Sequence, residues 1–462
     1  MHIPMKTICS AAAFALTTIA ATTVAAQAAP QATNIIFFLG DGMGPTTITA
    51  ARIHQYKEEG LLHFERLDRT ARVKTYSADA MVTDSAPSMG AYMTGVKINN
   101  DVISLRDAKP VAPGRDANGN PTIDRCGDNN GSAPQTILEL AKAAGKSVGA
   151  VTSTELTHAT PASTFAHVCN RNAVYEIARQ IVPGGAGYNS RLMTGVDVLM
   201  GGGRPHFTPY DAKTNPKGRA DGRNLLAEFE ARGYFLAATR ADMMSALPNR
   251  KFIGIYGDSH LDYASTRKAT QPTLAEMTTK SIELLSKNPK GFFLMVEGGK
   301  IDHALHDSNA QNALAEVVDF DSAVQAALER MRQLDPGLEH TLIVVTADHD
   351  HTMVMNGYPK RGNPVLDIVR GADGRPARDA DGKTYTTLVY GGGPNRPEVR
   401  ADVDSARALA PDYRQETAVR LSGEGHGGGD VKLYATGAGS APLRGTIENT
   451  RVFDLMKAAF GL

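Results

Sequence analysis

The stretch Thr83-Asp84-Ser85-Ala86 places a serine hydroxyl in a chain that is otherwise well supplied with metal-ligating side chains. A serine hydroxyl is a poor nucleophile at neutral pH, and coordination to a metal ion is one way to generate its alkoxide. Ser85 therefore predicts a metal-activated nucleophile that needs no Ser-His-Asp arrangement. The residues that could ligate such ions are Asp41, Thr160, Glu297, Asp302, His306, Asp348, His349 and His426.

Two of these residues are spaced to hold one ion. Asp302 and His306 lie four residues apart, so they share one face of a short helix or turn after Gly298-Gly299. Catalytic zinc takes imidazole nitrogen and carboxylate oxygen while one coordination position stays open. The isolated His426 is the natural third protein ligand, so these three residues predict one zinc site.

A second ion is predicted where Asp348-His349 follows the apolar run 341–347. Asp41 adds a second carboxylate to this pair, and the Ser85 oxygen would take the open position. Two ions roughly 4 Å apart clamp the attacking and the leaving oxygen of an in-line displacement. The pattern therefore predicts a site for phosphoryl transfer.

The remaining residues indicate a third ion and a phosphate clamp. Asp41, Thr160 and Glu297 offer only oxygen ligands, which suits magnesium. Arg171 carries a planar guanidinium group that can bind two phosphate oxygens at once. We therefore expect Ser85 and Arg171 to act beside a centre of three ions.

Apolar runs rich in Ile, Val, Phe and Leu alternate with longer helical patterns, which is typical of a parallel sheet covered by helices on both faces. We expect strands over residues 34–40, 147–152, 196–200, 252–256, 292–296, 342–346 and 431–435. We expect helices over residues 45–59, 134–144, 223–232, 274–286, 310–334 and 449–460. The predicted fold class is a doubly wound α/β fold with a mostly parallel central sheet.

Such a sheet also predicts where the ligands meet. In open α/β sheets the ligand site lies outside the carboxyl ends of the strands. Asp41, Glu297 and Asp348-His349 fall at expected strand ends, as does the segment from Thr154 onward. One carboxylate after a strand is often only a helix cap, but ligand-type residues at several strand ends predict a common site.

Residues 1–26 resemble a secretory signal peptide, with Lys6 before the apolar core 11–21. No later run approaches the roughly 20 apolar residues of a transmembrane helix, so we expect a soluble mature chain that is periplasmic or secreted. Residues 27–462 are predicted to form a single catalytic domain, because its ligands come from both ends of the chain. A Gly- and Pro-rich insertion is expected at about 351–425.

The charges balance, with 49 Lys and Arg against 49 Asp and Glu, and loss of Lys6 with the leader leaves one excess acid. This balance predicts no general electrostatic footprint for nucleic acid. Cys126 and Cys169 are the cysteines that remain after the leader, and an exported chain permits a disulfide between them. Two free thiols are the alternative, because two cysteines define no framework by themselves.

Several motifs of the chain resemble those of alkaline phosphatases, from about residue 34 to the last expected helix. They are Gly40-Asp41-Gly42-Met43-Gly44, Thr83-Asp84-Ser85-Ala86, Ala159-Thr160-Pro161-Ala162, Val296-Glu297-Gly298, Asp302 with His306, Thr346-Ala347-Asp348-His349 and Gly425-His426-Gly427. The resemblance implies hydrolysis of phosphate monoesters through a transient phosphoserine at Ser85, with Arg171 binding the phosphate. It further implies a zinc ion at Asp302, His306 and His426, a second zinc at Asp41, Asp348 and His349, and a magnesium ion at Asp41, Thr160 and Glu297.

The chain departs from the best-known enterobacterial members, which have an Asp and a Lys where this chain has His158 and His303. Animal members have His at both positions, so we expect both imidazoles around the magnesium and His303 also beside the substrate. Segments 357–364 and 390–394 look like the animal type, in which this region forms a surface crown near the subunit contact. A homodimer is thus one oligomeric state that the chain could adopt.

Other functions share part of this pattern. A phosphodiesterase or a sulfatase-like enzyme could use the same two-metal core, although Arg171 would occupy the space that a second ester group needs. A non-catalytic exported protein that stores metal or binds phosphate could carry the ligands, but retention of Ser85 argues against it. Among the other histidines, His351 is expected to form a hydrogen bond at the rim of the site, and His260 has no ligand partner at a useful spacing.

Overall fold

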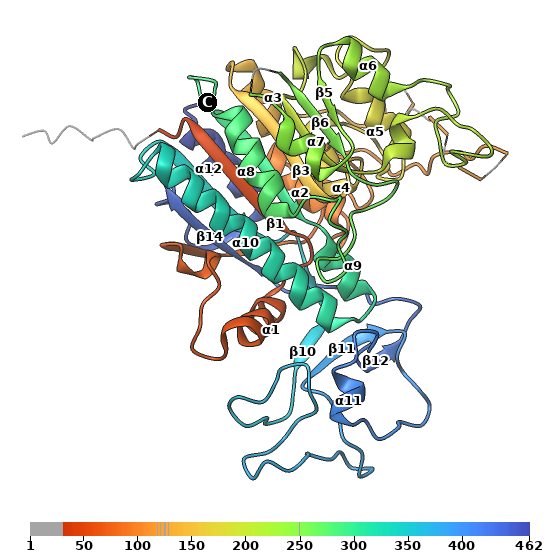
Figure 1. The fold of residues 1–462 in the computed structure, drawn as a ribbon, viewed down its shortest axis with the longest axis vertical. Helices are drawn as coiled ribbons and strands as arrows, with labels where there is room; N and C mark the ends of the chain where they lie inside the picture. Colours follow the sequence, from red (N-terminus) through yellow and green to blue (C-terminus); the bar gives the residue numbers. More distant parts are fainter. Residues whose placement is uncertain (1–30, 118, 121, 124–125, 128, 249) are drawn as a thin grey trace, which may run out of the picture.

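The computed structural model describes residues 31–462 except 118, 121, 124–125, 128 and 249 (Figure 1). The predicted signal peptide, 1–26, lies outside the described residues. Within them, no helix is both long enough and apolar enough to cross a membrane.

A ten-stranded sheet forms the centre of the fold. Its spatial order is β15 (Gly445–Glu448), β2 (Arg69–Lys74), β14 (Val431–Gly437), β8 (Thr341–Thr346), β1 (Asn34–Gly40), β7 (Phe292–Gly298), β3 (Ser147–Glu155), β4 (Val198–Gly202), β6 (Phe252–Ile255) and β5 (Phe235–Ala237). The seven strands from β8 to β5 are parallel, whereas β14 runs antiparallel to both of its neighbours. The predicted mostly parallel sheet is confirmed. Each predicted strand is present, β1 with its predicted ends and the others with slightly different ends.

Helices cover this sheet in two layers (Figure 1). One layer contains α1 (Pro45–Tyr56), α8 (Leu274–Leu285) and α10 (Ala310–Leu334), and the other contains α2 (Ser85–Thr94), α3 (Ile137–Ala143), α4 (Ala159–Phe165) and α12 (Asn449–Ala459). Helix α10 has the bounds predicted from its periodicity, because Ala313, Val317, Phe320 and Val324 form a buried stripe along it. The shorter helices are α5 (Val174–Gln180), α6 (Leu225–Ala231), α7 (Arg240–Ser245) and α9 (Lys300–His306).

Helices α2 and α4 were not among the predicted helices, although both border the site. All ten residues of α2 and all seven of α4 are buried. A helix without a polar face has no alternation for a sequence pattern to detect. Asp84 begins α2 as its N-cap, with its carboxylate accepting from the Ala86 amide at 2.7 Å.

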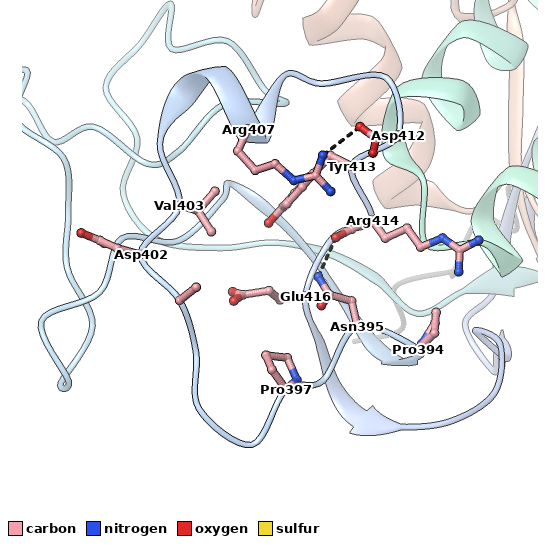
Figure 2. A pocket seen from close by; sticks show the side chains of 11 residues that line it. Pro394, Asn395, Pro397, Asp402, Val403, Arg407, Asp412, Tyr413, Arg414 and Glu416 are labelled. Atoms are coloured by element: carbon pink, nitrogen blue, oxygen red, sulfur yellow. Dashed lines mark hydrogen bonds and ion pairs between the residues drawn. The ribbon is translucent and has the colours of Figure 1, made fainter.

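The expected insertion region leaves the main sheet after β8. It contains β9 (Asp350–His351), β10 (Met353–Met355), β11 (Leu388–Gly393), α11 (Ser405–Ala408) and β12 (Thr417–Arg420), and β10, β11 and β12 form a small separate sheet. This region contains a cavity of about 420 Å³, and two of its lining residues, Arg407 and Asp412, form an ion pair at 2.8 Å. Figure 2 shows the side chains that line the cavity. The residues that form the metal centre lie elsewhere, along the edge of the large sheet.

Candidate metal centre

The strand order explains why distant ligands meet. Strands β8, β1, β7 and β3 are neighbours, and Leu39 of β1 lies opposite both Thr346 of β8 and Glu297 of β7. Asp41 and Asp348 follow directly beyond these positions. Because the strands are parallel, their carboxyl ends bring the three carboxylates to one edge, as the sequence predicted.

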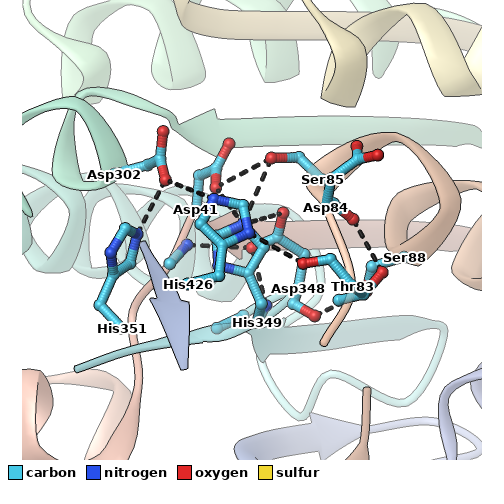
Figure 3. A network of polar contacts seen from close by, with 12 residues as sticks. Asp41, Thr83, Asp84, Ser85, Ser88, Asp302, Asp348, His349, His351 and His426 are labelled. Atoms are coloured by element: carbon cyan, nitrogen blue, oxygen red, sulfur yellow. Dashed lines mark hydrogen bonds and ion pairs between the residues drawn. The ribbon is translucent and has the colours of Figure 1, made fainter. Parts of the chain in front are cut away.

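Ser85 lies within one group of candidate ligands. Its Oγ is 3.4 Å from Asp41 Oδ1 and 3.3 Å from His349 Nε2 (Figure 3). The same His349 nitrogen is 3.2 Å from Asp41 Oδ1 and 3.4 Å from Asp348 Oδ2. All four residues are buried, so their polar atoms converge on a small volume away from solvent.

A second group gathers around Asp302. Its Oδ1 is 3.1 Å from His306 Nε2, one turn further along α9, and 3.5 Å from His426 Nε2. The two imidazole nitrogens are 3.2 Å apart. His426 is brought here by β13 (His426–Gly427), which pairs antiparallel with β9. The side chain of His306 is 39% exposed, so the centre opens to solvent on this side.

The third group contains Asp41, Thr160 and Glu297, all of them buried. Within the described residues, Asp41 Oδ2, Thr160 Oγ1 and Glu297 Oε1 are buried oxygens without a hydrogen-bond partner. A nitrogen of His158 lies within 4.8 Å of carboxylate oxygens of Asp41 and Glu297. Buried oxygens without partners are costly, and a cation would satisfy them.

The protonation of the histidines also fits metal ions. In three imidazoles Nδ1 is engaged by a backbone carbonyl, which leaves the Nε2 lone pair directed into the centre. The pairs are His306 with the Glu424 carbonyl at 2.6 Å, His426 with Thr83 at 2.8 Å and His349 with Asp350 at 3.2 Å.

The carboxyl groups of the centre differ in their pKa values: those of Asp41, Asp348 and Glu297 are raised, whereas at Asp302 hydrogen bonds from three imidazoles outweigh burial and lower the pKa. Burial and the neighbouring carboxylates raise the pKa of Asp41 well above its ordinary value. Burial raises the pKa of Asp348 to about 6 and that of Glu297 to about 7. Divalent cations would stabilise the ionised forms, so the donor set fits metal binding.

His351 and Glu424 form a buried support that the sequence did not reveal. His351 Nε2 is 2.8 Å from Asp302 Oδ1, and its Nδ1 bonds the Glu424 carboxylate. Burial alone would lower the pKa of His351, but the hydrogen bonds with Asp302 and Glu424 raise it to about 10. The expected hydrogen bond is present, but the expected rim position is wrong, because the pairing of β9 with β13 buries His351.

Arg171 lies beside the nucleophile, held by two partners. Its Nη1 donates to Asp84 Oδ1 at 3.0 Å, and its Nη2 donates to His158 Nε2 at 3.2 Å. Burial opposes the charge, yet Asp84 keeps the pKa of Arg171 above its ordinary value. The predicted disulfide is present, and it joins Cys126 to Cys169 two residues before this arginine.

His158 and His303 lie side by side, with ring centroids 5.6 Å apart. Sequence spacing suggested no partner for His260, but the fold packs its ring edge-to-face against His303 at 4.3 Å. Burial lowers the pKa of His303 to about 4 and that of His260 to about 3, so both are neutral at pH 7. No local pattern could show this contact, because the loop after β6 approaches α9 only in the folded chain.

Comparison with known proteins agrees with this geometry. A sequence profile of the family described as alkaline phosphatase matches residues 32–462. The chain belongs to the alkaline phosphatase family. A membrane-bound alkaline phosphatase of Bombyx mori is 35% identical over 93% of this chain and 80% of its own length. The tissue-nonspecific alkaline phosphatase of Gallus gallus is 35% identical over 93% of this chain and 84% of its own.

Solved alkaline phosphatase structures share the fold. The enzyme of Thermus thermophilus superimposes with a TM-score of 0.68 at 26% identity, over 97% of this chain and 96% of its own. Membership confirms the predicted fold class and an enzyme of the alkaline phosphatase type, and the grouped ligands agree with a metal-dependent hydrolase.

Proposed function

We propose that the chain hydrolyses phosphate monoesters through a phosphoserine at Ser85. The observation that supports this most directly is the position of Ser85 Oγ, within 3.4 Å of both Asp41 and His349. Ser85 is also the first residue of α2, where the positive end of the helix dipole favours a bound phosphate. A nucleophile and an anion site therefore coincide.

We assign two zinc ions and one magnesium ion to the three groups. Asp302, His306 and His426 would hold one zinc, and Asp41, Asp348 and His349 the other, with Ser85 at its open position. Asp41, Thr160 and Glu297 would hold the magnesium through oxygens that lack other partners. When bound, the ions would supply positive charge for the attacking and leaving oxygens and lower the pKa of the serine hydroxyl.

The side chains around the ions have distinct roles in the reaction. Ser85 Oγ attacks phosphorus in line with the departing oxygen, and the alcohol leaves with a proton from solvent. The Arg171 guanidinium can hold two non-bridging oxygens, because Asp84 orients it from one side. Water then attacks the phosphoserine and releases inorganic phosphate. His303 would contact the phosphate as a neutral hydrogen-bond donor from the magnesium side.

A diesterase or sulfatase activity is the second candidate, since the two-metal core alone does not select monoesters. The guanidinium of Arg171 favours the monoester, because a second ester group would compete for the oxygens that the arginine binds. Residues 27–462 would act as a single catalytic domain with the insertion 351–425. We further propose export to the periplasm or the exterior, directed by residues 1–26, and leave open a homodimer formed through the insertion.

An acid-quench experiment tests the mechanism. Stopping turnover with labelled 4-nitrophenyl phosphate should trap label on Ser85, and Ser85→Ala should lose the label and most activity. Ser322→Ala is the matched control, because that hydroxyl bonds only its own helix at Val318. Label on a residue other than Ser85 would contradict the assignment. Faster hydrolysis of a diester or a sulfate ester than of the monoester would contradict the substrate class.

A further inference from the structure

The segment just before the nucleophile carries exposed apolar side chains. Tyr76 is 44% exposed, Met81 is 90% exposed and Val82 is 38% exposed. Large apolar side chains so close to a polar centre are a recurrent feature of ligand sites, in which apolar walls surround a few polar groups. The exposure of these three apolar side chains therefore suggests a role in binding rather than in the core of the fold.

This segment lies against the open side of the centre. The Thr83 carbonyl accepts from His426 Nδ1 at 2.8 Å, and a Cβ on Gly428 would lie 3.3 Å from Val82 Cγ2. His306 is the exposed ligand on that side, whereas Ser85 and His349 are buried. This exposed side is where we expect a substituent on the phosphate to leave the centre, next to the segment that contains Thr83.

A cavity of about 490 Å³ begins where such a substituent would emerge. Residues 74–81 line it together with Gly428 and Asp430. Gly428 is two residues beyond His426, which is at most about 7 Å along an extended chain. The near wall of the cavity is therefore within reach of a group attached to a phosphate at the centre.

The aromatic side chain in this cavity is held in place. Lys97 Nζ lies 3.5 Å from the ring centroid of Tyr76 and donates to its carbonyl oxygen at 2.6 Å. Glu448 in turn pairs with Lys97 at 3.4 Å. A ring fixed by a cation on one face can stack a planar group without a large loss of its own freedom.

We propose that Tyr76 and Met81 form a subsite for the planar aromatic leaving group of the monoester, such as a nucleoside. This inference rests on the proposed phosphomonoesterase function and adds the class of substrate that is hydrolysed best. In an in-line displacement the leaving oxygen departs opposite Ser85 Oγ, towards the group of Asp302, His306 and His426. Gly428, two residues beyond His426, lines the cavity, so the subsite would hold the departing group without contacting the phosphate.

Two substrates with the same kind of leaving oxygen test the subsite. Adenosine 5′-monophosphate and glycerol 3-phosphate both release a primary alcohol, so their ratio of kcat/KM reports recognition beyond the phosphate. Tyr76→Ala should lower this ratio about fivefold or more, since stacking a base on an aromatic ring is worth about 1–3 kcal/mol. Met81→Ala should lower it less, while Tyr76→Phe should retain it.

Met244→Ala provides the matched control, because Met244 is exposed on α7. The kcat/KM for glycerol 3-phosphate should stay the same in all four variants. An unchanged ratio in Tyr76→Ala and Met81→Ala, or an equal loss for both substrates, would overturn the subsite. A change in subunit assembly with an unchanged ratio would identify the face as a subunit contact and also overturn it. Absence of phosphate on Ser85 in the parent would instead contradict the proposed function.

Discussion

Removal of the metal ions should make the stability of the protein strongly dependent on pH. The perturbation is chelation followed by exchange into metal-free buffer, compared with protein loaded with zinc and magnesium. Without ions, burial raises the pKa of Asp348 from 3.8 to about 6 and that of Glu297 from 4.5 to about 7. A carboxyl whose pKa is higher in the folded state binds more protons when folded, so folding loses stability as pH rises.

The size of the effect follows from the two shifts. The loss begins near the unfolded pKa values of about 4 and is complete above the folded values, near pH 8. Treated as independent groups, Asp348 and Glu297 together contribute roughly 4 kcal/mol between pH 5 and pH 8. Relative to the metal-loaded protein, the metal-free protein should therefore lose about 4 kcal/mol over this interval, a large fraction of ordinary domain stability.

Urea unfolding at pH 5 and pH 8, with and without metal, measures this difference. Burial also raises the pKa of Glu316 to about 7, but Glu316 titrates alike in both forms and cancels in the comparison. The stability gap between loaded and metal-free protein should widen from pH 5 to pH 8, since the ions bind ionised carboxylates. A gap of the same size at both pH values would refute the reasoning.

Three further substitutions test other parts of the centre. Glu424→Gln removes the charge that pairs with His351, so it should weaken zinc binding about tenfold. Activity in zinc buffers measures this affinity, and an unchanged affinity would show that Glu424 does not support the zinc ligands through His351. His158→Asp combined with His303→Lys should tighten magnesium binding and alter inhibition by phosphate. Turnover is measured against magnesium concentration, and the same magnesium dependence in variant and parent would show that these histidines do not influence the magnesium site. Cys126→Ser opens a cross-link spanning 43 residues and should cost about 4 kcal/mol in urea unfolding, and a loss near zero would contradict that value.

The sequence predicted those parts of the structure that have a local pattern. Helix α10 has its predicted bounds because one face is apolar and the other polar, and β1 was visible as an apolar run. Asp41, Glu297 and Asp348 were expected to meet because parallel strands share their carboxyl edge. Each of these inferences rests on the periodicity of apolar residues or on the position of a residue at a strand end, and both can be recognised within a single segment of sequence.

The remaining features arise from contacts between segments. Helix α2 is buried on all sides, so it has no periodic polar face. Glu424 looks like any acid in a glycine-rich loop until β9 and β13 bring it to His351. His260 reaches His303 of α9 from the loop after β6, and sequence spacing cannot report such an approach. Contacts of this kind, between residues far apart in the sequence, can be identified only from the three-dimensional structure.

The position of β1 in the sheet also determines when the protein can fold during its synthesis. Strand β1 is made first but lies between β7 and β8, so its pairing partners emerge about 250 and about 300 residues later. At typical ribosome speeds its apolar surface waits roughly 10–50 seconds for a partner. A nascent chain in that state would depend on chaperones to prevent strand-to-strand aggregation. In the exported chain that we propose, the same delay would help to keep the chain unfolded until it is translocated across a membrane.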